Sequence, residues 1–192
     1  MRTLVAVSLV VAALLAGCGG GDGGGGGGDG GVPPKQWASD VCGALGTWLS
    51  DLQSRETQIE SDLENADSSD LGSIKRILVD FLDDAVTETD EMIDDVEAAG
   101  TPDVDRGDEL QQDFVNGISK ARTAFQDAKT TAEDLSTDDQ QAFTEGAQKI
   151  EDQLDAESEA IEDTFNRLDE KYDVPDLDKA FDEEPACEDV SS

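Results

Sequence analysis

Apolar side chains recur at every third or fourth position along most of the chain after residue 34, which is the period of an amphipathic helix. Four such stripes follow one another, with an average spacing of about 3.5 residues, as in helices that pack along one another. The stripes comprise Trp37, Val41, Leu45, Trp48, Leu52, Ile59 and Leu63, then Leu71, Ile74, Leu78, Phe81, Ala85, Met92, Val96 and Ala99, then Leu110, Phe114, Ile118, Ala121, Phe125, Ala128, Ala132 and Leu135, and finally Phe143, Ala147, Ile150, Leu154, Ile161, Phe165, Leu168 and Tyr172. No stretch alternates between apolar and polar residues for long enough to predict a β-strand.

The interruptions between the stripes hold residues that begin or end helices. They are the N-cap candidates of residues 67–70, Gly100 with Pro102, the capping-box pair Thr137 and Gln140, and Pro175 with a short helical segment of about residues 176–182 behind it. Helices of about 30 residues span about 45 Å, and short connections make neighbours antiparallel. We therefore predict an all-α fold, an elongated up-down four-helix bundle with a short C-terminal helical segment.

The first 17 residues form a segment of another kind. Arg2 precedes an apolar run from Leu4 to Leu15, a pattern typical of a secretory signal peptide and too short for a transmembrane helix. Residues 15–18, Leu-Ala-Gly-Cys, resemble the lipobox of bacterial lipoproteins. The resemblance implies that residues 1–17 are removed as a signal peptide and that Cys18 carries a diacylglycerol anchor in the cell membrane, outside the cytoplasm. An ordinary cleaved signal would leave an odd cysteine unexplained.

Residues 18–33 are expected to link this anchor to the folded domain. Residues 19–31 contain only Gly and Asp, a composition that predicts a flexible coil with a reach of about 20 Å. The Gly-Asp pattern lacks the large apolar residue of calcium-binding β-roll repeats. The run Val32-Pro33-Pro34 stiffens the end of the linker, so we place the acidic bundle domain at residues 34–192.

The charge balance excludes several functions. The chain has 13 Lys and Arg against 47 Asp and Glu, a net charge of −34, and no His. Binding to nucleic acid requires cations that neutralise phosphates, and an anionic membrane surface would repel this chain. We therefore expect no nucleic-acid partner and membrane contact through the lipid anchor only. Without His there is no imidazole base, no Ser-His or Cys-His pair and no His ligand, so we expect no enzyme, no cofactor and no metal site.

Carboxylates cover the face opposite each stripe, as at Asp83 and Asp84. Residues 103–109 resemble the start of a calcium loop, but they lack the third oxygen ligand before Gly107 and the closing Glu. We interpret the acids as a solvated surface and as helix caps, with at most weak, non-specific binding of divalent cations. Salt should stabilise such a domain by screening its self-repulsion.

Two tryptophans, Trp37 and Trp48, lie on the first stripe close to Gly43 and Gly46. One interpretation is ordinary core packing of the indole rings. The other is a notch for a hydrophobic ligand beside the two glycines, where backbones can approach closely. The sequence leaves both open.

The remaining cysteines, Cys42 and Cys187, form an even pair once Cys18 is lipidated, and an oxidising compartment favours a disulfide between them. Four antiparallel helices return the chain to the end that holds Cys42 by about Tyr172, and the tail is long enough to reach it. An odd number of traverses would leave the sulfurs about 45 Å apart. The bond and the even helix count are therefore one prediction, against the alternative of two free buried thiols.

Three short motifs carry a further resemblance. Trp-Ala-x-x-Val-Cys-x-Ala-Leu at residues 37–45, Gly-Thr-Pro at 100–102, and Ala180-Phe181 with Pro-Ala-Cys at 185–187 look like small secreted proteins and lipoproteins of high-GC Gram-positive bacteria. The resemblance implies a location and a scaffold, and no activity. We expect a non-enzymatic envelope protein that binds another, unknown envelope protein. The alternative is a carrier of a small hydrophobic or lipid-like ligand, which a tunnel above about 300 Å³ would favour.

Overall fold

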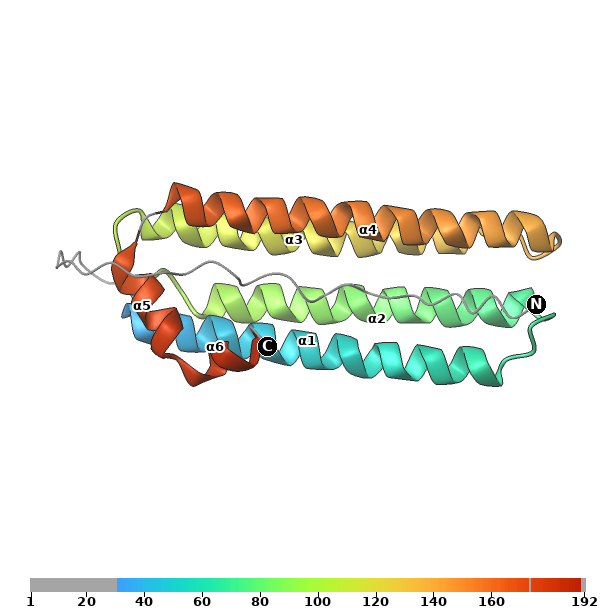
Figure 1. Ribbon diagram of the computed structural model, residues 1–192, viewed down its shortest axis with the longest axis horizontal. Coiled ribbons are helices and arrows are strands. Elements are labelled where there is room, and N and C mark those ends of the chain that lie inside the picture. The colour runs from blue at the N-terminus through green and yellow to red at the C-terminus, as the bar shows by residue number, and fades with distance from the viewer. Residues whose placement is uncertain (1–30, 173, 191–192) are drawn as a thin grey trace.

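Six helices make up the computed structural model, which describes residues 31–172 and 174–190. They are α1 (Pro34–Asn65), α2 (Leu71–Ala98), α3 (Gly107–Glu133), α4 (Gln140–Lys171), α5 (Pro175–Glu183) and α6 (Pro185–Val190). The four long helices run up and down beside one another, and α5 and α6 lie across one end of α1 (Figure 1). The predicted all-α bundle of four long helices with a short C-terminal helical segment is confirmed. The predicted signal peptide, Cys18 and most of the linker lie outside the described residues.

The two ends of the bundle differ. One end holds residues 31–34, the α2–α3 connection and α5, and we call it the linker end. The other holds the α1–α2 and α3–α4 connections, and we call it the far end. With 32 residues each, α1 and α4 are about 48 Å long, so the two ends are separated by roughly that distance.

The folded domain begins earlier than the sequence predicts. The amide of Val32 donates to the carbonyl of Thr101 at 2.7 Å, and the amide of Asp103 donates to the carbonyl of Val32 at 2.7 Å. A Cβ on Gly31 would lie 2.7 Å from the Cα of Asp103, so this close approach requires glycine. The predicted boundary at residue 34 is corrected to about residue 31, because these backbone hydrogen bonds fasten the end of the linker to the α2–α3 connection.

One continuous core runs along the bundle. Its most deeply buried large side chains are Trp37, Leu82, Val41, Val96, Thr89, Pro102 and Cys42. On α3 the buried positions include four alanines, Ala121, Ala124, Ala128 and Ala132. Such small side chains allow helix backbones to lie close together, and α3 packs against both α2 and α4.

The helix ends show which capping predictions hold. Asp70 caps α2 by accepting from the amide of Ser73 at 3.0 Å, and Gly100 follows α2 with a φ of 76°, as expected of a terminating glycine. The capping box predicted at Thr137 and Gln140 is wrong. Asp139 is the N-cap of α4, and its carboxylate accepts from the amides of Gln141 and Ala142. A carboxylate next to the first turn satisfies these amides directly, so the helix starts at Gln140.

Ion pairs join neighbouring long helices at their surfaces. The pairs are Arg55 of α1 with Asp84 and Glu88 of α2, Arg122 of α3 with Asp90 of α2, and Lys129 of α3 with Asp83 of α2. Each involves partly exposed side chains, so solvent screens the attraction and the contribution to stability is small. Part of the acidic surface of α2 thus holds its two neighbours in register.

The long helices pack only with their neighbours in the sequence. Backbones approach closely between α1 and α2, between α2 and α3, and between α3 and α4. The first and last long helices, α1 and α4, do not pack along each other, and α1 instead contacts α5 and α6.

Candidate functional site

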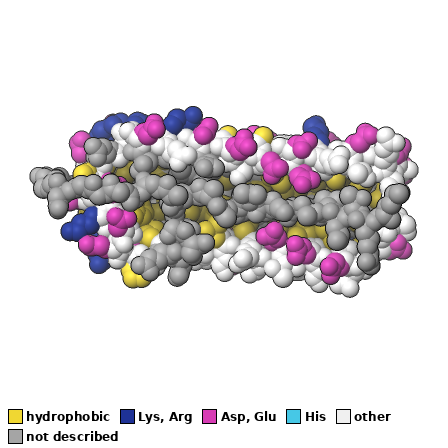
Figure 2. Space-filling model, viewed as in Figure 1, with side chains coloured by type: hydrophobic (Ala, Val, Ile, Leu, Met, Phe, Trp, Pro, Cys, Tyr) yellow, Lys and Arg dark blue, Asp and Glu magenta, His cyan; other side chains and the backbone are white. Residues whose placement is uncertain are grey.

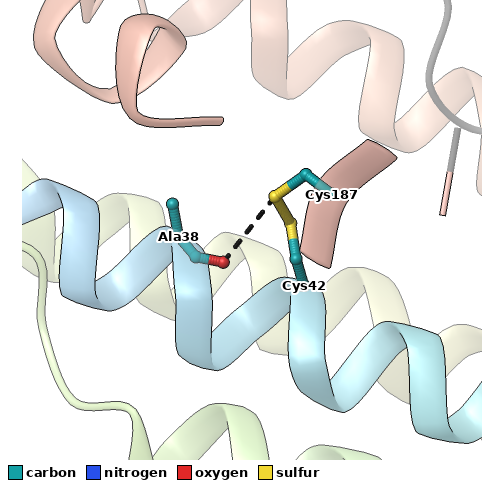
Figure 3. The surroundings of a disulfide bond; sticks show 3 residues. All are labelled: Ala38, Cys42 and Cys187. Atoms are coloured by element: carbon teal, nitrogen blue, oxygen red, sulfur yellow. Dashed lines mark hydrogen bonds between the residues drawn. A yellow bond between two sulfur atoms is a disulfide. The ribbon is translucent and has the colours of Figure 1, made fainter. Parts of the chain in front are cut away.

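The linker end holds the disulfide that the sequence predicts. Cys42 of α1 and Cys187 of α6 are joined with an S–S distance of 2.00 Å and a Cα–Cα distance of 5.1 Å (Figure 3). Both residues are buried, and the sulfur of Cys187 lies 3.9 Å from the carbonyl oxygen of Ala38, one turn before Cys42. The bond fixes the C-terminal segment to the first helix beside the point where the chain enters the domain.

Trp37 is the centre of the linker end. Its indole N–H donates to the carbonyl of Gly100 at 2.8 Å and to Oε1 of Gln111 at 2.9 Å. Its ring meets Phe114 of α3 and Phe181 of α5 edge to face, with centroids 5.8 and 5.9 Å apart. One side chain thus ties α1 to the α2–α3 connection, to α3 and to α5.

Gln111 completes this polar cluster. Its amide nitrogen donates to the carbonyl of Val96 at 2.7 Å, while its amide oxygen accepts from Trp37. Nothing in the sequence distinguishes Gln111, because a glutamine beside a stripe residue looks like any polar surface position. Within this cluster, the indole N–H of Trp37 and the amide nitrogen of Gln111 both donate to acceptors in the protein. The cluster therefore has a structural role.

Trp48 makes the second buried polar contact. Its indole N–H donates to Oγ1 of Thr89 at 3.1 Å, and the hydroxyl of Thr89 donates to the carbonyl of Ala85 at 2.6 Å. Thr89 is fully buried. The sequence held a signal for it, since the second stripe skips from Ala85 to Met92 and Thr89 fills the core position between them.

The two tryptophans therefore follow the core-packing interpretation, and the notch beside the glycines does not form as described. Gly43 is exposed, and a Cβ added there would meet nothing within 4 Å. It lies about 200° around the helix from Val41, on the solvent side. Gly46 is only half-buried and lies 180° from Trp37 by the same count. Among the described residues, no second backbone approaches Gly43, so the close approach expected there is not seen in this part of the chain.

A cluster of polar side chains closes the start of α3 against the end of α4. The hydroxyl of Tyr172 and the ammonium of Lys171 donate to the same carboxylate oxygen of Asp113, at 2.7 and 2.6 Å. These two hydrogen bonds, that from Lys171 above all, hold the pKa of Asp113 below its usual range. Arg106 lies over the Tyr172 ring at 4.7 Å from its centroid. Arg106 also has a left-handed backbone, with a φ of 58°.

A surface depression of about 420 Å³ lies beside the α2–α3 connection. Its lining comprises Glu97, Gly100, Thr101, Asp108, Gln111, Gln112, Val115 and Asn116. The depression opens to solvent and most of its lining residues are polar, so it differs from the enclosed apolar tunnel that a carrier of hydrophobic ligands needs.

Further features bear on metal binding and membrane insertion. Within residues 31–172 and 174–190, no group of three or more Cys, Asp or Glu side chains is arranged to hold a metal ion. The described helices also include none with the length and apolar character needed to cross a membrane. Buried side-chain nitrogen and oxygen atoms of the described part all have hydrogen-bond partners.

Comparison with known proteins adds no relationship to this geometry. No protein family, no curated protein and no solved structure matches the chain.

Proposed function

We propose that this protein is a lipid-anchored, extracytoplasmic helical bundle that has no catalytic activity and binds another component of the cell envelope. One observation carries the proposal, the pairing of Cys42 with Cys187. Buried disulfides persist in oxidising compartments outside the cytoplasm. The pairing uses two of the three cysteines and leaves Cys18, the residue of the lipobox-like sequence, as the odd one.

The position of the linker supports an anchored role. The chain enters the domain at Val32, which is hydrogen-bonded to the α2–α3 connection at the linker end. With an anchor at Cys18, the Gly-rich linker would hold this end within about 20 Å of the membrane. The far end would then project a further 48 Å or so, and the long sides of the bundle would be open to a partner.

The buried polar groups have structural roles in the bundle. Trp37 bonds to Gln111 and Trp48 bonds to Thr89, and each pair also bonds to backbone carbonyls. The alternative role as a carrier gains no support from the depression near Gln111, because that depression is open to solvent and would not enclose a hydrophobic ligand.

Substitution of Cys18 tests the anchor. The wild-type chain should partition into the detergent phase on Triton X-114 extraction, and the Cys18→Ala variant should lose acylation at this position. We expect metabolic labelling with a radioactive fatty acid to mark the wild type and not the variant. A variant that stays fully acylated and membrane-bound after a high-salt wash would refute the anchor.

Crosslinking in the intact envelope tests the interaction. Lysine-directed or photo-activated crosslinking followed by mass spectrometry should recover one specific partner with the wild-type protein. Recovery of the same partner at wild-type levels with a chain lacking residues 34–190 would show that the bundle does not bind it.

A further inference from the structure

We draw no further inference here: the strongest candidate, the solvent-open depression beside the α2–α3 connection, is lined by exposed carboxylates like those scattered over the surface in Figure 2, and no buried polar side chain of the described residues is left without a hydrogen-bond partner to face a ligand there.

Discussion

The buried polar residues show how single side chains specify this bundle. Thr89 occupies a core position where an apolar residue would fit the stripe, and it accepts the indole N–H of Trp48. A buried N–H group that has no acceptor loses its hydrogen bond to water without replacing it, and this destabilises the folded state. Trp48 and Thr89 therefore match one another, and this match fixes the relative position of α1 and α2.

We expect Thr89→Val, which keeps the shape and removes the acceptor, to lower the free energy of unfolding by about 1–3 kcal/mol. In a Trp48→Phe background, where no indole N–H needs an acceptor, the same change should cost about 1 kcal/mol less. Urea denaturation of the four proteins of this double-mutant cycle measures the difference. Equal costs in both backgrounds would show that the hydrogen bond contributes nothing.

The Asp113 cluster makes a pH-dependent contribution. Hydrogen bonds from Lys171 and Tyr172 lower the pKa of Asp113 in the folded state, so the folded state favours the charged carboxylate. This stability is present above the ordinary Asp pKa of about 3.9 and is lost as the pH falls through the lower pKa of the folded state. Asp113→Asn should destabilise the domain by about 0.5–1 kcal/mol at pH 7.

We expect this difference between the wild type and Asp113→Asn to shrink as the pH is lowered from 5 towards 2, when the wild-type carboxyl also becomes protonated. Thermal unfolding across this range measures it. The exposed Asp80, which enters none of the ion pairs described above, provides the matched control Asp80→Asn. A difference that grows on acidification would contradict the assigned direction of the pKa shift.

At the scale of the element, helix boundaries depend on local chemistry that several nearby residues can supply. Residues 136–139 (Ser-Thr-Asp-Asp) offer four capping candidates before α4. The structure uses Asp139, whose carboxylate reaches two amides of the first turn at 2.8 and 3.1 Å. A carboxylate there also interacts favourably with the positive end of the helix dipole.

Asp139→Ala should therefore destabilise the domain by about 0.5–2 kcal/mol, whereas Thr137→Ala should change its stability by less than about 0.5 kcal/mol. Hydrogen exchange should show faster exchange of the amides of Gln141 and Ala142 in the first variant only. The reverse order of effects would restore the capping box at Thr137.

At the scale of the whole molecule, the disulfide and the even number of long helices depend on each other. Four traverses bring the chain back to the linker end, where α5 and α6 place Cys187 against Cys42. The bond closes a loop across a sequence separation of 145 residues. It therefore fastens the C-terminal segment, α5 and α6, to the first helix.

We expect the double variant Cys42→Ser, Cys187→Ser to lose about 4–5 kcal/mol of stability in the chain-entropy model, and less if the reduced unfolded chain retains structure. Amides of α5 and α6 should exchange faster, while those of α2 and α3 should lose protection only by global unfolding. Thiol labelling of denatured, non-reduced protein should find neither Cys42 nor Cys187 reactive. Two reactive thiols per chain in material from an oxidising compartment would refute the bond in the native protein.

The sequence by itself determined the four long helices, their approximate ends and the cysteine pair, whereas it predicted one short C-terminal helical segment where the structure has two, α5 and α6. Helical periodicity and capping signals are local, and the return of the chain after four antiparallel helices follows from helix length alone. The core placement of Trp37 and Trp48 was one of two interpretations of their stripe, and only the structure chose between them. Their partners, Gln111 and Thr89, come from other helices, so no local pattern assigns them.

Only the tertiary structure decided which sides of the helices meet. An apolar stripe that is wide enough for two neighbours does not say which two helices will cover it. In the described part of the chain, α3 packs on α2 and α4, while α5 and α6 contact α1. The hydrogen bonds of Val32 with Thr101 and Asp103 likewise join two segments about 70 residues apart. The folded bundle brings these segments together, and no pattern along the chain predicts their contact.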